Sequence, residues 1–152
     1  MEEDMLYTEK AHFVAAEELR KVNLWVGLVA TVAAAASVAS IVASGPKVIS
    51  GVLALLAAIA SATMTFVRPE EKAAQHLSAA KALGVTRVKT RQYREIDLKS
   101  EQPEHVAEWR RMVTEIGEAK GRADDAAPSI SERRFQKARR KIQAGDFSHD
   151  SV

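Results

Sequence analysis

The strongest constraint on the fold is the stretch from Val22 to Val67, in which Lys47 is the only charged residue. Uncharged runs lie on both sides of this lysine, from Val22 to Pro46 and from Val48 to Val67. At about 1.5 Å of rise per residue, each run makes a helix of roughly 30 Å or slightly more, which is the thickness of a hydrocarbon core. The pattern therefore predicts two passes through a bilayer.

The two predicted spans are separated only by Ser44, Gly45, Pro46 and Lys47. So short a connection forces the two helices to be antiparallel. The alternative is a pair of buried helices in a soluble protein, but the rest of the chain has too little apolar sequence to cover two such rods on every side. We therefore expect an all-α protein built around a two-span transmembrane helical hairpin.

Basic residues at the ends of the spans predict the orientation of the hairpin, because Lys and Arg are retained on the cytoplasmic side. Arg20 and Lys21 precede the first span, Arg68 and Lys72 follow the second, and Lys47 stands alone in the opposite turn. Both termini should therefore be cytoplasmic, with the protein held in the cell membrane.

The overall composition, 47% hydrophobic and 28% charged, is that of an ordinary soluble domain, but the charges are segregated outside the hairpin. This segregation predicts a membrane unit with a polar cytoplasmic appendage. We expect four segments: an N-terminal amphipathic helix (1–21), the hairpin (22–67), a juxtamembrane helix (68–100), and a helical tail with a disordered end (101–152). Basic residues are in excess in the juxtamembrane segment, where anionic lipid headgroups would attract them.

Helix signals continue after the hairpin. Pro69 and the two glutamates that follow it are typical of a first helical turn, so a helix should begin there. From Pro103 a further helix places apolar residues at spacings of three and four, and Gly117, Gly121 and the run Asp124 to Pro128 should end it. The apolar stripe of this helix consists of Val106, Trp109, Val113 and Ile116.

The last predicted helix, Arg133 to Ala144, is strongly basic. Ser129 and Glu132 have the spacing of a capping box at its start. The basic cluster from Arg133 to Lys141 could contact lipid headgroups or a nucleic acid, or it could be a solvated surface that pairs with acidic neighbours. We favour the solvated surface, because charge runs are more often of that kind, and we do not expect a nucleic-acid partner.

Small side chains recur every fourth residue on one face of each predicted span. In lipid such a face lets helix backbones approach closely and is the usual packing surface. We expect the two spans to pack through these faces and to leave surface for neighbouring copies, so the protein should be a homo-oligomer. The residues are Gly27, Thr31, Ala35 and Ala39, continued by Ala43, in the first span, and Ala54, Ala58 and Ala62 in the second.

Hydroxyl groups form weak polar stripes in both spans. Ser37, Ser40 and Ser44 lie near the far end of the first span, and Ser61 and Thr65 lie near the cytoplasmic end of the second. In a helix each hydroxyl can donate to a carbonyl one turn earlier, which is the interpretation that we favour. The alternative interpretation is the lining of a pore.

The sequence contains none of the residue constellations that are typical of enzymes. There is no cysteine, no glycine loop that would bind phosphate and no nucleophile motif. The histidines are far apart in sequence and form no pair of ligands at helical spacing. They are His12, His76, His105 and His149. We therefore expect no enzymatic activity, no cofactor and no metal site.

Three segments carry a resemblance to a known family. They are Ala11-His12-Phe13-Val14-Ala15-Ala16-Glu17-Glu18-Leu19-Arg20, the hairpin, and Phe66-Val67-Arg68-Pro69-Glu70-Glu71-Lys72-Ala73-Ala74-Gln75-His76. This order of a short amphipathic helix, an Arg-containing turn into two spans and a helix that begins at a proline resembles the SLATT family of small bacterial membrane effectors. The resemblance covers roughly Met5 to Tyr93.

The resemblance implies a pore-forming or membrane-perturbing effector of bacterial anti-phage immunity of the abortive-infection type, located in the inner membrane. It also implies a nucleotide-producing or nucleotide-sensing partner protein in the cytoplasm. The residues themselves indicate only a membrane hairpin that faces the cytoplasm and associates with the lipid bilayer and with its own copies. The alternative function is a passive membrane anchor or scaffold that holds a cytoplasmic partner protein at the membrane.

Overall fold

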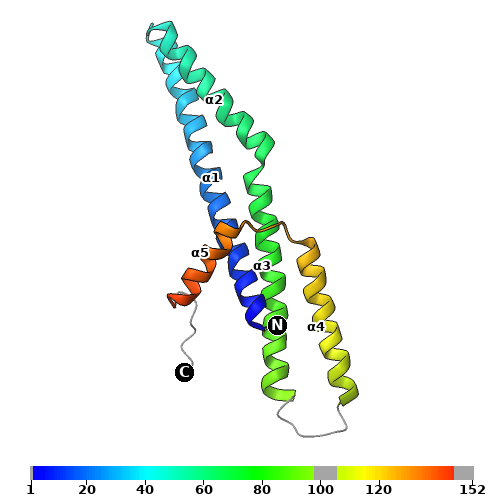
Figure 1. Cartoon of the computed structure of the whole chain (residues 1–152). Coiled ribbons are helices and arrows are strands. Elements are labelled where there is room, and N and C mark those ends of the chain that lie inside the picture. The colour runs from blue at the N-terminus through cyan, green and yellow to red at the C-terminus, as the bar shows by residue number, and fades with distance from the viewer. Residues whose placement is uncertain (1, 98–105, 146–152) are drawn as a thin grey trace. The chain divides into compact units, whose positions relative to one another are not determined.

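The computed structural model describes residues 2–97 and 106–145, and within these ranges the chain is helical without a β-strand (Figure 1). The elements are α1 (Glu2–Val42), α2 (Lys47–Val67), α3 (Pro69–Gln92), a π-helical turn (Tyr93–Asp97), α4 (Val106–Ala126) and α5 (Glu132–Gln143). The all-α prediction is confirmed. Two of the expectations, a helix start at Pro103 and a disordered segment at 146–152, lie outside the described residues.

The helices form two compact units. One unit contains Glu17–Ala73, and therefore most of α1, all of α2 and the start of α3. The other contains Met1–Ala16 together with Ala74–Val152, so that the first part of α1 lies with α3, α4 and α5. Each unit has its own packing and is described separately.

In the unit of Glu17–Ala73, the connection between α1 and α2 is a tight turn at Ser44 and Gly45. Ser44 has a positive φ of 54°, and the Gly45 N–H donates to the carbonyl of Ser40 over 2.7 Å. A Cβ atom at position 45 would lie 2.6 Å from the Ser40 hydroxyl oxygen, so only glycine fits this approach. Pro46 then precedes the first residue of α2.

A second left-handed residue separates α2 from α3. Arg68 has φ 46° and ψ 57°, and its N–H donates to the carbonyl of Met64. Pro69 is the first residue of α3, where its fixed φ is suitable and its missing N–H costs nothing. The helix start expected at Pro69 is therefore present.

Both α1 and α2 are long and apolar enough to cross a membrane. Their large apolar side chains are mostly exposed in the unit, with Val42 80%, Val48 77% and Phe66 84% exposed. The two long apolar helices predicted from the sequence are therefore confirmed.

In the other unit, the first part of α1 packs against α3, α4 and α5. Met5 of α1, Leu83 of α3 and Ala123 of α4 form one buried cluster. A second buried cluster is made by Ala11, Val14 and Ala138, against which Ile130 and Phe135 pack. The basic helix α5 is thus attached to α1 through an apolar face that includes Phe135.

The end of α4 and the start of α5 differ in part from the sequence predictions. α4 continues through Gly117 and Gly121, because an isolated glycine lowers helix propensity by only about 1 kcal/mol and does not itself end a helix. The helix ends at Ala126, within the run Asp124 to Pro128 that is also expected to end it. α5 begins at Glu132 with Ser131 as its N-cap residue and without a side-chain capping bond. The capping box expected from Ser129 and Glu132 is therefore wrong, since the turn places the cap two residues later.

Candidate functional site

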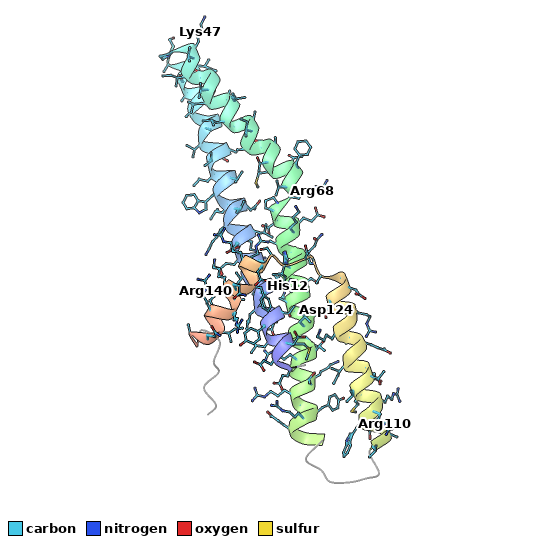
Figure 2. All side chains as sticks on the ribbon, viewed as in Figure 1. His12, Lys47, Arg68, Arg110, Asp124 and Arg140 are labelled. Atoms are coloured by element: carbon cyan, nitrogen blue, oxygen red, sulfur yellow. The ribbon has the colours of Figure 1, made fainter. Side chains whose placement is uncertain are left out.

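The structure brings together two buried histidines, His12 of α1, labelled in Figure 2, and His76 of α3. Their Nδ1 atoms lie 2.8 Å apart, and the ring centroids are 5.1 Å apart with the planes tilted by 44°. The two residues are only 2% and 3% exposed. The candidate functional site is this buried polar contact, which joins residues 64 positions apart in the sequence.

The hydrogen bond between the rings fixes how many protons the pair can hold. One Nδ1 must carry a hydrogen and the other must present its lone pair. A neutral pair meets this requirement, and so does a pair with one extra proton on an Nε2. Two imidazolium rings do not, because both Nδ1 atoms would then be donors. Full protonation would therefore separate His12 from His76.

The electrostatic surroundings keep the pair neutral at pH 7. Burial is the largest cause that lowers the pKa of His12 to about 4, and His76 lowers it further, whereas Asp124 of α4 acts in the opposite direction. Burial is also the main cause that lowers the pKa of His76, followed by the positive charge of Arg134 on α5. Groups on α3, α4 and α5 thus all shift the pKa of one or the other histidine.

The distance between the rings is that of a hydrogen bond and not that of two metal ligands. Two nitrogens that bind one tetrahedral zinc ion at about 2.0–2.1 Å would lie about 3.3 Å from each other. In residues 2–97 and 106–145, no group of three His, Cys, Asp or Glu is placed to hold a metal ion. The two Nδ1 atoms are therefore placed to share one proton in a hydrogen bond.

Small residues beside the histidines allow α1 and α3 to approach each other. Ala15 and Ala16 on α1 and Ala79 and Ala80 on α3 are all buried. The buried positions recur at spacings of three and four, as they must on one face of a helix. They are Met5, Glu9, His12 and Ala16 on α1, and His76, Ala80 and Leu83 on α3.

An ion pair extends the contact between α1 and α3. The Glu9 carboxylate lies 2.8 Å from Nε of Arg87, and the side chains are 7% and 21% exposed. Gly84 lies beside this pair, and a Cβ atom there would be in ordinary contact with the Glu9 carboxylate at 3.4 Å. Removing one partner from a largely buried ion pair leaves the other charge uncompensated, which is costly. The pair therefore helps to hold the N-terminal part of α1 on α3.

The predicted small-residue faces are not the contact between α1 and α2. Gly27 is partly buried, while Thr31, Ala35, Ala39, Ala54, Ala58 and Ala62 are exposed. Between residues 17 and 67, the buried positions of these two helices are instead Ala33, Ser37, Ser50, Ala57 and Ala60. The structure thus corrects the expectation that the two helices pack on each other through the predicted faces. That these faces contact other copies stays a prediction.

Serine hydroxyls explain why a different face is buried. The Ser37 hydroxyl donates to the carbonyl of Ser50 over 2.9 Å, and the Ser50 hydroxyl donates to the Ser40 hydroxyl over 2.9 Å. For Ser37 the expected bond to its own helix is therefore wrong, since the hydroxyl bonds across to α2. For Thr65 the same expectation is confirmed, because its hydroxyl donates to the carbonyl of Ser61.

The four basic residues that define the predicted topology are all exposed. Lys21 pairs with Glu17 over 2.6 Å and Arg68 with Glu71 over 3.3 Å, each within its own stretch of chain. Arg20 lies 3.9 Å from Glu70. Lys72 is exposed on α3, and Lys47 lies at the turn between α1 and α2 (Figure 2).

Sequence reasoning missed the histidine pair, because it searched for histidines at helical spacing within one segment. A signal was nevertheless present. His12 and His76 each lie among alanines on the buried face of a helix, and each belongs to one of the three segments that carry the family resemblance. A polar ring on a small apolar face indicates a partner on the facing helix.

Comparison with protein-family models, with curated proteins and with solved structures finds no match to this chain.

Proposed function

We propose that the chain is an effector of the bacterial inner membrane that spans it twice, with both termini cytoplasmic, and that self-associates through its helical hairpin. When activated, its assemblies dissipate ion gradients in anti-phage immunity of the abortive-infection type. The membrane part of this proposal is supported by the two apolar helices. The effector part is supported by the resemblance of residues 5–93 to the SLATT family.

The observation that carries the proposal is the exposure of large apolar side chains along both apolar helices. Val42, Val48 and Phe66 are each more than three-quarters exposed, and Leu24, Trp25, Ile41 and Leu55 are each more than 60% exposed. Moving one such side chain out of water is worth about 1.5–3 kcal/mol. A chain in water would have to cover this surface, whereas a bilayer supplies apolar surroundings for it.

Self-association is supported by the small residues that the unit of Glu17–Ala73 leaves exposed. Ala35 and Ala39 on α1, and Ala58 and Ala62 on α2, are not used in the contact between the two helices. In lipid, small faces of this kind let helices of different copies approach closely. An assembly of several hairpins, in which exposed hydroxyls such as those of Thr31, Ser61 and Thr65 face water, would provide a path for ions.

An effector of this kind must be restrained until a signal arrives. The contact between the N-terminal part of α1 and α3, which His12, His76, Glu9 and Arg87 make, is our candidate for the restraint. The signal would come from the nucleotide-producing or nucleotide-sensing cytoplasmic partner that the family resemblance implies. A passive scaffold is the second candidate function, and the open groove between α3 and α4 favours it.

Membrane potential, measured with a voltage-sensitive dye, tests the proposal. Expression of the chain with its cognate partner in the activated state should collapse the potential. Ala58→Leu should abolish the collapse while leaving membrane insertion intact, because the larger side chain separates neighbouring hairpins. Val52→Leu is the matched control, since Val52 is exposed on α2 outside the small-residue face.

One result would reject the effector function, and another would reject the proposed assembly face. A protein that reaches the membrane and binds its partner, yet leaves the potential unchanged, is a scaffold. A collapse that Ala58→Leu and Val52→Leu alter equally would show that the small-residue face does not mediate assembly.

A further inference from the structure

An open groove of about 1260 Å³ runs between α3 and α4, within the unit that contains Ala74–Val152. Its floor is apolar and is made by Ala82 and Val85 of α3 and by Met112, Ile116 and Ala119 of α4. Val85 is 59% exposed. The lining on α3 and at the start of the π-helical turn extends from Gln75 to Tyr93, which is about 27 Å of helix. The groove is therefore as long as a helix of about 18 residues.

The charges beside this groove are mainly positive. Lys81, Lys89 and Arg122 line it, against the single carboxylate of Glu115. Glu115 is paired with Arg111 over 3.1 Å, and Arg122 lies 3.6 Å from Glu118. In the part of the chain that the structure describes, Lys81 and Lys89 have no ion-pair partner. Because they are eight residues apart on one helix, their Cα atoms are about 12 Å apart.

The N-terminal part of α1 shows what these two helices bind. This segment is acidic and amphipathic, and it places Met5 against Leu83 of α3 and Ala123 of α4. Its carboxylates pair with basic residues around that contact, namely Asp4 with Lys120 over 3.3 Å, Glu2 with Arg94 over 2.6 Å and Glu9 with Arg87 over 2.8 Å. Ala123 also lines the groove, so the groove adjoins this contact.

We propose that the groove between α3 and α4 binds an acidic amphipathic helix of a partner protein. The apolar face of that helix covers Ala82, Val85 and Met112, in the way that helices dock in grooves through residues at spacings of three, four and seven. Two of its carboxylates, about two turns apart, pair with Lys81 and Lys89. The inference goes beyond the proposed membrane function and does not depend on it.

Charge complementarity selects this partner over a second copy of the chain. Three carboxylates of the acidic segment of α1, those of Glu2, Asp4 and Glu9, are already engaged by Arg94, Lys120 and Arg87 within one chain. The basic helix α5 would be repelled by Lys81 and Lys89, because like charges across an interface are costly. A separate acidic helix meets the apolar and the basic parts of the groove together.

The test uses the full chain in nanodiscs of uncharged lipid and a display library of 18-residue helical peptides. Surface positions of the peptides are randomised among Asp, Lys, Gln and Leu. We expect enriched peptides to carry a Leu stripe flanked by Asp residues about two turns apart. Binding of these peptides to the double variant Lys81→Glu/Lys89→Glu should fall about tenfold or more, and replacing their Asp residues by Lys should restore binding to that variant.

The matched control is Arg139→Glu/Arg140→Glu, which makes the same change in charge on exposed residues of α5 outside the groove. This variant should bind the enriched peptides as the wild type does. Equal losses in the two variants would show only general attraction to a basic protein and would overturn the proposal. So would a library that yields no enrichment over empty nanodiscs, or one that yields Lys-rich peptides.

Two further outcomes assign the groove to other occupants. A cysteine introduced by Ala82→Cys that cross-links two copies within the groove would make it an interface of the homo-oligomer. Protection of the same cysteine by vesicles with anionic lipid, and not by the acidic peptides, would make it a lipid contact. Either result overturns the assignment to an acidic helix.

Discussion

Lowering the pH from 7.5 to 5.5 should loosen the contact between the N-terminal part of α1 and α3. The pKa of His12 is about 4 in the folded protein, below its ordinary value of 6.5. The separated state therefore takes up a proton more readily than the paired state. The stability that the pair contributes is complete above about pH 6.5 and is lost as the pH falls from there towards about 4.

The size of the effect follows from these two values. At pH 5.5 a separated His12 is mostly protonated while the paired His12 is neutral, so the free energy of opening falls by about 1.4 kcal/mol from this residue alone. A loss of this size increases the open population about tenfold. The lowered pKa of His76 acts in the same direction.

Hydrogen–deuterium exchange in nanodiscs measures the opening. After correction for the intrinsic effect of pH, amides of α1 and α3 in residues 5–16 and 74–87 should exchange about tenfold faster at pH 5.5 than at pH 7.5. The double variant His12→Leu/His76→Leu keeps the packing and lacks both titrating rings, so its corrected rates should not change. Equal pH dependence in the wild type and the variant, or slower wild-type exchange at pH 5.5, would refute the reasoning.

Four further predictions concern the apolar helices. The protein should remain with membranes after alkaline carbonate washing. Recovery in the soluble fraction would indicate that residues 22–67 form the buried core of a soluble protein. Reporter fusions at both termini should give cytoplasmic signals, because the basic flanks favour that side; a periplasmic signal from either end would contradict this topology. Ala35→Leu should shorten the ladder of cross-linked oligomers and the exposed control Ala34→Leu should not, since contacts between small faces are worth on the order of 1 kcal/mol each. Ser37→Ala should destabilise the protein in detergent by about 1 kcal/mol, because the buried Ser37 hydroxyl bonds across to the Ser50 carbonyl of α2. Ser61→Ala should have little effect on the thermal midpoint, because Ser61 is exposed.

The helix ends that depend on local chemistry could be predicted from the sequence. α1 ends at Val42 and α2 begins at Lys47, on either side of the expected break, and α3 begins at Pro69. A left-handed turn next to Gly45 and a proline at a first helical position are local requirements. For this reason a short sequence window contains them.

The features that depend on tertiary contacts could not be predicted in this way. Alanine occurs on nearly every face of the two apolar helices, so their pattern does not select a packing surface. The serine contacts across the turn select it, and they bury Ala33 and Ala57 in place of Ala35 and Ala58. The histidine pair joins residues 64 positions apart, and a periodic pattern within one segment holds no information about such a contact.

The serine contacts near the turn also determine how the two apolar helices can separate. A slide of one helical turn, about 5.4 Å, would break the bonds that join Ser37, Ser50 and Ser40, so the axial register is fixed at this end. At the other end of the same unit, Asn23 of α1 donates a hydrogen bond of 3.3 Å to Glu70 at the start of α3, and Arg20 lies 3.9 Å from the same carboxylate. Both contacts are exposed, so water can replace them. The helices can therefore open as a wedge whose apex is the turn, and the widest gap would form at the end where Asn23 lies.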